Sequence, residues 1–217
     1  TGSAQELLMT AGSLRILKTG VFFLCLVPIL KLAAQAFELG GFTLGANPVE
    51  ELIHRFGSWG LHFLLITLAV TPLRRLTGWN RVLRLRRMFG LFAFFYVLMH
   101  FLTYAGLDQR FNLAVIFEDI AERPYITVGF TALVLMIPLA LTSTNGMMRR
   151  LGRRWQKLHR LVYPIAILGV WHFYWQVKLD TLEALIYAVI LAMLLGYRLF
   201  YRWRREHDRI THARQLL

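Results

Sequence analysis

Residues 86–105 read RRMFGLFAFFYVLMHFLTYA: two arginines, then a run that is apolar almost throughout and contains one histidine, His100. About 20 apolar residues in a helix are enough to cross the hydrocarbon core of a bilayer. An ionisable side chain at such a depth costs free energy, and it usually faces the interior of a helical bundle and has a function there. The stretch therefore predicts a membrane-spanning helix that carries a polar group in need of a partner.

Five other apolar runs of similar length lie along the 217 residues, of which 57% are hydrophobic and 17% charged. We predict an all-α membrane protein, a six-transmembrane-helix bundle with spans at residues 17–37, 57–74, 88–107, 124–142, 158–177 and 182–201. The transmembrane domain then occupies residues 17–201, between a cytoplasmic segment at 1–16 and a basic cytoplasmic tail at 202–217. The connections are too short to contain a soluble catalytic domain.

The formal net charge of +13 is distributed in a way that favours membrane topology over nucleic-acid binding. Most Lys and Arg residues lie near the two ends of the chain and in the connections after the second and fourth spans, whereas most acidic residues lie in the other connections. By the positive-inside rule, both termini are cytoplasmic. Because this rule already accounts for the basic runs, we predict no nucleic-acid partner and expect some of the basic side chains to contact membrane lipid.

Four prolines fall inside the predicted spans, at Pro28, Pro72, Pro138 and Pro164. Membrane helices tolerate proline because neighbouring helices or side chains can bind the carbonyl that proline leaves without a donor. We therefore expect local bends there. No internal repeat is evident in the sequence, which gives no support to an inverted-repeat transporter.

A second histidine, His172, lies deep in the predicted span at 158–177. With a rise of about 1.5 Å per residue, His100 lies roughly 18 Å and His172 roughly 21 Å from the cytoplasmic ends of their helices. Two imidazoles at one level on different helices are typical of the axial ligands of a haem iron. A proton relay, a substrate contact and simple packing are the alternatives. The chain has no C-x-x-C-H string, so covalent attachment of a haem is excluded.

The two other histidines in predicted spans, His159 and His62, differ from this pair. His159 precedes His172 by 13 residues, which places the two about 140° apart around an ideal helix. It could ligate a second, inner haem, contact a propionate or a flavin, or cap the loop. At the matching depth the third span offers arginines, Arg86 and Arg87, and no histidine. His62 lies six residues into the second span, and we expect it to be a polar packing residue.

Six pieces of sequence occur in order between about residues 50 and 200: ITLAVTPLRRLTG, RRMFGLF, MHFLTYA, RPYITVG, LTSTNGMMRRLGRRWQKLH and WHFYW. As an ordered set they resemble the MsrQ (YedZ) family of the ferric-reductase-like transmembrane superfamily, which also includes the NADPH oxidases. The resemblance implies a multi-pass protein of the bacterial inner membrane that binds b-type haem, with His100, His159 and His172 at the haem-linked positions. It further implies the flavin FMN.

The resemblance also implies partners. Electrons would come from quinol or from a cytosolic flavin reductase and would go to MsrP, a periplasmic molybdopterin-dependent methionine sulfoxide reductase that repairs oxidised proteins. Arg84, Arg86, Arg87 and Arg153 become candidate contacts for haem propionates or the FMN phosphate. Topology and contact with lipid phosphate are the other explanation of these arginines. Candidate neighbours of the flavin are Thr142, Ser143 and Trp155.

The sequence also lacks a G-x-G-x-x-G dinucleotide-binding motif. We therefore predict an electron-transfer subunit with no catalytic residues and no substrate-reducing domain of its own. A ferric or other metal reductase of the same superfamily is one alternative. A transporter or assembly factor without a redox cofactor is the other.

Overall fold

The structure is a computed structural model that describes residues 2–41, 43–176 and 181–215, and these residues form helices and short connections without a strand. The long helices are α1 (Gly2–Ala36), α2 (Pro48–Thr77), α3 (Arg86–Thr103), α5 (Pro124–Leu141), α8 (Val162–Gln176) and α9 (Thr181–Gln215). The short ones are η1 (Leu39–Gly41), η2 (Asn80–Arg84), η3 (Tyr104–Asp108), α4 (Leu113–Glu122), α6 (Asn145–Leu151), α7 (Arg153–Leu158) and η4 (His159–Leu161).

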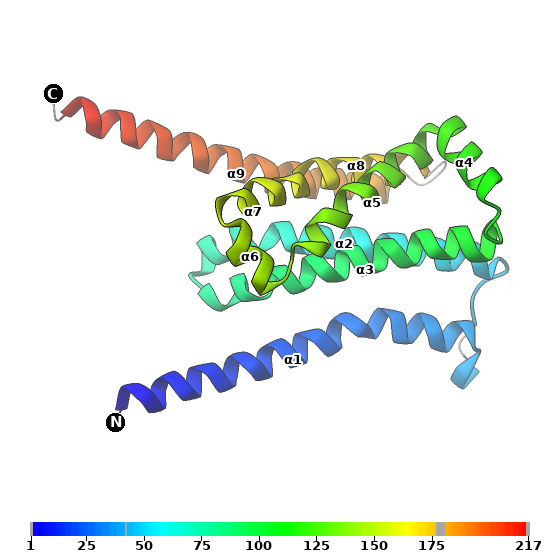
Figure 1. Cartoon of the computed structure of the whole chain (residues 1–217), viewed down its shortest axis with the longest axis horizontal. Helices are drawn as coiled ribbons and strands as arrows, with labels where there is room; N and C mark the ends of the chain where they lie inside the picture. Colours follow the sequence, from blue (N-terminus) through cyan, green and yellow to red (C-terminus); the bar gives the residue numbers. More distant parts are fainter. Residues whose placement is uncertain (1, 42, 177–180, 216–217) are drawn as a thin grey trace.

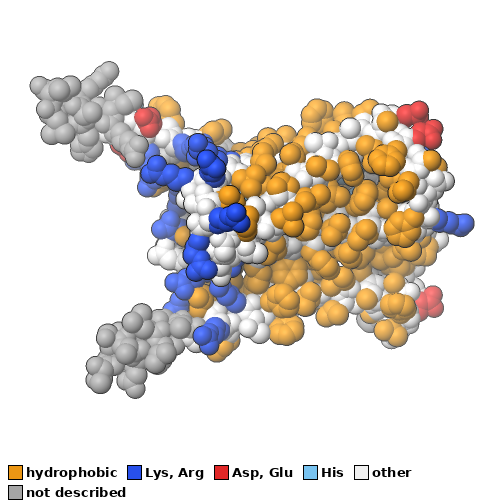
Figure 2. All heavy atoms as spheres, in the orientation of Figure 1, with side chains coloured by type: hydrophobic (Ala, Val, Ile, Leu, Met, Phe, Trp, Pro, Cys, Tyr) orange, Lys and Arg blue, Asp and Glu red, His pale blue; other side chains and the backbone are white. Residues whose placement is uncertain are grey.

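The long helices lie side by side, with α1 set apart from the rest of the bundle along much of its length (Figure 1). Helix α2 is the central element. Of the 18 residues in its most apolar segment, 56% are buried inside the protein, against 17–22% in the corresponding segments of the other candidate spans. Figure 2 shows hydrophobic side chains over the middle of the molecule, with Lys and Arg concentrated toward one end and most of the visible Asp and Glu at the other. This is the surface expected of a bundle in a bilayer.

Among the described residues, five helices are long and apolar enough to cross a membrane: Gly12–Ala36, Pro48–Thr77, Arg86–Asp108, Pro124–Leu141 and Thr181–Asp208. The prediction of an all-α membrane protein is confirmed at this level. The predicted span at 158–177 is divided instead, because η4 ends at Leu161 and α8 contains only 15 residues, roughly 22 Å of helix. Pro164 therefore lies in the first turn of α8, where the N–H that proline lacks would have no partner within the helix. Residue 177, the end of the predicted span, lies outside the described residues.

Local signals explain where α2 begins and ends. Asn47 is its N-cap and accepts a hydrogen bond from the Glu50 amide, and Pro48 occupies the first turn. Gly78 ends the helix in the left-handed conformation at φ 70°. The helix thus starts nine residues before the predicted boundary at 57. Likewise, α1 and α9 continue as helix into the predicted terminal segments, residues 1–16 and 202–217.

Side chains from neighbouring helices complete the backbone hydrogen bonds near two prolines, as expected. The hydroxyl of Tyr96, which is fully buried, donates to the Cys25 carbonyl at 2.7 Å and accepts from the Ile29 amide at 3.2 Å. This links α3 to α1 beside Pro28. In α2, Pro72 cannot donate to the Leu68 carbonyl, and Nη2 of Arg198 donates to that carbonyl at 2.6 Å.

Candidate cofactor site between the histidine helices

The structure brings His100 of α3 and His172 of α8 together in one cavity. Their ring centroids are 6.0 Å apart and the ring planes are inclined by 74°. A metal–imidazole bond is about 2.0–2.1 Å long, and the ring centroid lies about 1.1 Å beyond the nitrogen, so a metal between two opposed rings places the centroids about 6 Å apart. The observed separation fits one metal atom between the two rings.

Hydrogen bonds to backbone carbonyls fix the tautomer of each ring. Nδ1 of His100 is 2.8 Å from the Ile53 carbonyl oxygen, and Nδ1 of His172 is 2.7 Å from the Tyr125 carbonyl oxygen. Because a carbonyl only accepts, each Nδ1 donates a proton and each Nε2 keeps its lone pair. Metal-binding histidines are oriented in this way by their second nitrogen. Both residues are therefore prepared to ligate a metal through Nε2.

A glycine on the neighbouring helix makes room for each ring. A Cβ atom added to Gly57 of α2 would lie 3.0 Å from Nδ1 of His100, and one added to Gly129 of α5 would lie 2.8 Å from Nδ1 and Cε1 of His172. Contacts of this length leave no space for a methyl group. The absence of a side chain at these two positions is thus what lets each imidazole lie against the backbone of the next helix.

The two halves of the site repeat one arrangement. In each, the histidine follows its carbonyl partner by 47 residues, and the glycine follows that partner by four residues. The helix pairs that carry them, α2 with α3 and α5 with α8, are also the two most extensively packed pairs among the described helices. No repeat is evident in the sequence as a whole, as expected. The expectation missed that the spacing of the site residues nevertheless repeats.

The cavity that contains the two histidines, here called the outer cavity, has a volume of about 360 Å³. Its deep part is apolar, and the side chains there include Leu61, Leu64, Leu133, Met136 and Ile165. Its rim is polar and includes Asn47, Glu50, His54, Tyr104, Asp108, Arg123 and Gln176. An apolar body with polar or charged groups at one edge is therefore the kind of ligand that fits.

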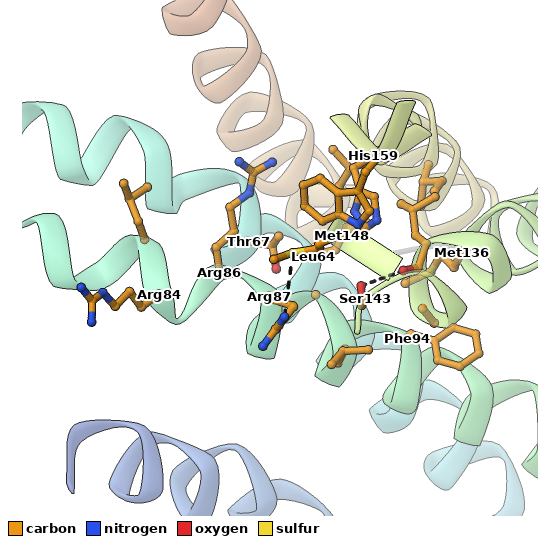
Figure 3. Close-up of a pocket in the computed structure, with 18 of the residues that line it drawn as sticks. Leu64, Thr67, Arg84, Arg86, Arg87, Phe94, Met136, Ser143, Met148 and His159 are labelled. Atoms are coloured by element: carbon orange, nitrogen blue, oxygen red, sulfur yellow. Dashed lines mark hydrogen bonds between the residues drawn. The ribbon is translucent and has the colours of Figure 1, made fainter. Parts of the chain in front are cut away.

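A second cavity of about 420 Å³, the inner cavity, adjoins the outer one, because Leu64, Met136 and Ile165 line both. Figure 3 shows Arg86, Arg87 and His159 near the same space, with Arg84 farther to one side. Its lining contains the cations Lys18, Arg84, Arg86 and Arg87, and no carboxylate is found among the described residues that line it. The inner cavity is therefore suited to an anionic ligand.

His159 lies against the inner cavity in a fixed orientation. Its ring stacks on Trp155, with centroids 3.9 Å apart, and Nε2 is 3.1 Å from the Thr142 hydroxyl. That hydroxyl donates to the Pro138 carbonyl at 2.6 Å, so it accepts from Nε2 of His159. Trp155 in turn donates from Nε1 to the Thr142 carbonyl at 3.0 Å. Consequently Nδ1 of His159 keeps the lone pair.

Comparisons with known proteins identify the family of this chain. The model of the family described as ferric reductase like transmembrane component matches residues 56–170. The chain belongs to this family. Similar relatives carry the name protein-methionine-sulfoxide reductase heme-binding subunit MsrQ: one from Xanthomonas euvesicatoria is 52% identical over 95% of this chain and 94% of its own length. One from Rhodospirillum rubrum is 53% identical over 92% of this chain and 98% of its own length. No solved structure matches.

The residues matched by the ferric-reductase-like family model include Gly57, His100, Gly129 and His159, whereas His172 lies just beyond the matched range. The alignments with the relatives, which cover more than nine tenths of the chain, are longer. The family relationship thus rests on most of the bundle and not on one motif.

The other predicted site residues are placed as follows. Ser143 lines the inner cavity, and its hydroxyl donates to the Leu139 carbonyl at 2.7 Å. Arg87 donates to Asn145 and lies 3.8 Å from the Met148 sulfur. Arg153 is exposed at the start of α7 and is not part of the cavity lining, so the structure does not group it with the other three arginines.

His62 lies outside the linings of both cavities. Its Nε2 is 2.8 Å from the Tyr187 hydroxyl, which donates to the Glu183 carboxylate at 2.8 Å. The imidazole thus forms part of the contact between α2 and α9, consistent with its expected role in packing. The sequence analysis did not identify the two carbonyl partners or the two glycines. Tyr125 and Gly129 lie inside the piece RPYITVG, which entered only through the family resemblance.

Proposed function

We propose that this chain is the haem-binding membrane subunit of a protein-methionine-sulfoxide reductase system, and that His100 and His172 are the axial ligands of a b-type haem in the outer cavity. The observation that carries the proposal is the paired geometry: two rings at the separation of a bis-imidazole metal site, each with Nδ1 bound to a carbonyl. The names of the similar relatives support it.

Bound haem would supply a one-electron redox centre, and two protein ligands leave no open coordination position for oxygen. The chain's own residues hold that centre. The carbonyls of Ile53 and Tyr125 orient the imidazoles, and the apolar side chains at the bottom of the outer cavity exclude water. The site is thus built for electron transfer and not for binding a substrate at the metal.

The inner cavity extends this proposal toward the cytoplasm. It would bind an anionic cofactor, FMN or a second haem, whose phosphate or propionates meet Arg84, Arg86 and Arg87. Two observations support this. The described lining residues include four cations and no carboxylate, and His159 and Trp155 stack on each other beside them. Because the two cavities adjoin, electrons could pass from the inner cofactor to the outer haem.

The direction of transfer follows from the orientation that the positive-inside rule assigns, with both termini in the cytoplasm and α8 counted as the fifth of six crossings. Most of the visible basic side chains lie at one end of the bundle and most of the visible acidic ones at the other (Figure 2). Quinol or a cytosolic flavin reductase would donate electrons, and a periplasmic molybdopterin-dependent methionine sulfoxide reductase (MsrP) would accept them. The chain would lie in the inner membrane.

Membrane vesicles can test this function. Vesicles that contain the chain, supplied with quinol and with MsrP and an oxidised protein on the periplasmic side, should reduce methionine sulfoxide. The rate should fall at least tenfold in His100→Ala vesicles and stay near wild type in His62→Ala vesicles. If the vesicles instead reduce external ferric citrate and transfer no electrons to MsrP, the metal-reductase alternative is correct.

A separate prediction concerns the inner cavity. His159→Ala should remove most of the second cofactor, measured as flavin and haem extracted per chain, because the substitution deletes both the imidazole and its stack on Trp155. The low-spin haem of the outer cavity should remain. Lys157→Ala, an exposed change on α7, is the control. Unchanged cofactor content and an unchanged reduction potential after His159→Ala would show that His159 binds no cofactor.

A further inference from the structure

Arg123 occupies a distinctive position at the rim of the outer cavity. It is the N-cap of α5 and stands two residues before Tyr125, whose carbonyl accepts the hydrogen bond from His172. Among the described residues that line this cavity, Arg123 is the only Lys or Arg. Its side chain is 55% exposed, so it is open to a ligand that reaches the rim.

A buried carboxylate holds this arginine in place. Nε of Arg123 is 3.0 Å from Oδ1 of Asp119, whose side chain is 6% exposed. The other oxygen of Asp119 accepts a hydrogen bond of 2.6 Å from the Tyr104 hydroxyl. The contact with Asp119 uses Nε, and a guanidinium has five N–H donors, so Arg123 can bind further acceptors. Tyr104 follows His100 by four residues and Arg123 precedes Tyr125 by two, so Asp119 connects the segment after His100 with the start of the helix that holds the carbonyl partner of His172.

The chemistry of the rim indicates what Arg123 binds. A porphyrin with propionate groups has an apolar body and carboxylates at one edge, and the cavity has an apolar depth and a polar rim. Glu50 and Asp108 on that rim would repel a carboxylate, whereas an arginine fork binds one with two hydrogen bonds. A fixed arginine at this place would therefore decide where the charged edge lies.

We propose that Arg123 binds a propionate of the haem in the outer cavity and that Asp119 is the residue that positions it. This inference rests on the proposed function, because it requires haem between His100 and His172. It adds a consequence for the redox chemistry. A positive charge beside the haem favours the reduced state, so Arg123 raises the reduction potential of this haem.

The test uses the purified haem-loaded protein and two readouts. In Arg123→Gln, the propionate bending band of the resonance Raman spectrum should move to lower frequency. The one-electron equilibrium constant for reduction should fall about tenfold, a shift of about 59 mV toward negative potential. Arg110→Gln is the matched control, because Arg110 is exposed in the same outer region and does not line the cavity. It should change neither readout.

Asp119→Asn separates propionate binding from a merely structural link. Because Asp119 only positions Arg123, the propionate band should move less than in Arg123→Gln, and because a negative charge near the rim is removed, the potential should not fall as it does in Arg123→Gln. If the two residues only held α4 and α5 together, both substitutions would break the same contact and shift the potential in the same direction. Should Arg123→Gln fail to fold, Arg123→Lys still loses the fork and should shift the Raman band.

The outcomes distinguish the two proposals. Wild-type protein without haem would overturn the proposed function. Wild-type protein with low-spin haem, but with an unchanged propionate band in Arg123→Gln and Arg123→Lys, would overturn the role of Arg123 alone. A band shift in Arg110→Gln as large as in Arg123→Gln would also overturn it, because the effect would then not depend on the rim of the cavity.

Discussion

Replacing either His100 or His172 with alanine is expected to abolish the low-spin haem spectrum of the purified protein. Each substitution removes one of two imidazoles that the structure places 6.0 Å apart. A methyl group cannot ligate a metal, and no other His, Cys, Asp or Glu gathers with the pair to form a three-residue metal site among the described residues. Absorption spectra and haem extraction measure the result, which should be a loss of more than tenfold.

His62→Ala provides the control for this experiment. It also removes an imidazole from a membrane helix, but His62 hydrogen-bonds to Tyr187 and lies outside both cavities. The His62→Ala protein should retain the spectrum. A normal bis-imidazole spectrum in either the His100 or the His172 variant would show that the two residues are not the ligand pair.

Gly129→Ala is expected to have nearly as large an effect, although it removes no ligand. The added Cβ would lie 2.8 Å from Nδ1 and Cε1 of His172, closer than real Cβ contacts allow. The ring cannot move away without losing its hydrogen bond to the Tyr125 carbonyl. Disturbing such outer-shell contacts typically weakens metal binding about 10- to 100-fold. Haem content and the proportion of low-spin haem should therefore both fall.

The effect should be graded across three glycines. Gly57→Ala would bring a Cβ to 3.0 Å from the His100 ring, slightly farther than in Gly129→Ala, and should cause a smaller loss. Gly196→Ala in α9 is the control, because nothing lies within 4 Å of its added Cβ. Equal haem content in all three variants would contradict the view that glycine is required beside each imidazole.

The sequence predicted the helices and the histidine pair because both have strong signals. Long apolar runs specify membrane helices, and an imidazole inside such a run is conspicuous. The rise per residue then placed His100 and His172 at one level, and the structure brings them into one cavity. Thr142 and Trp155 were predicted to be neighbours of a flavin, which stays a prediction, and the structure shows both of them as partners of His159.

The rest of the site was not readable from residue types. A backbone carbonyl leaves no mark in the sequence, so nothing pointed to Ile53 or Tyr125 as the groups that orient the ligands. Gly57 and Gly129 resemble any other glycine in a membrane helix until the opposing imidazoles are placed. The division of the predicted fifth span was missed because its apolar run continues across η4, where three residues tighten the helix.

The central claim is that His100 of α3 and His172 of α8 together hold a haem in the outer cavity. The most direct measurement is the absorption spectrum of the purified wild-type protein, oxidised and dithionite-reduced, with haem and flavin quantified by extraction. We expect at least one non-covalently bound haem b per chain, low-spin in both oxidation states with two axial imidazoles. A colourless protein from haem-replete cells, or a haem that is high-spin throughout, would contradict the account.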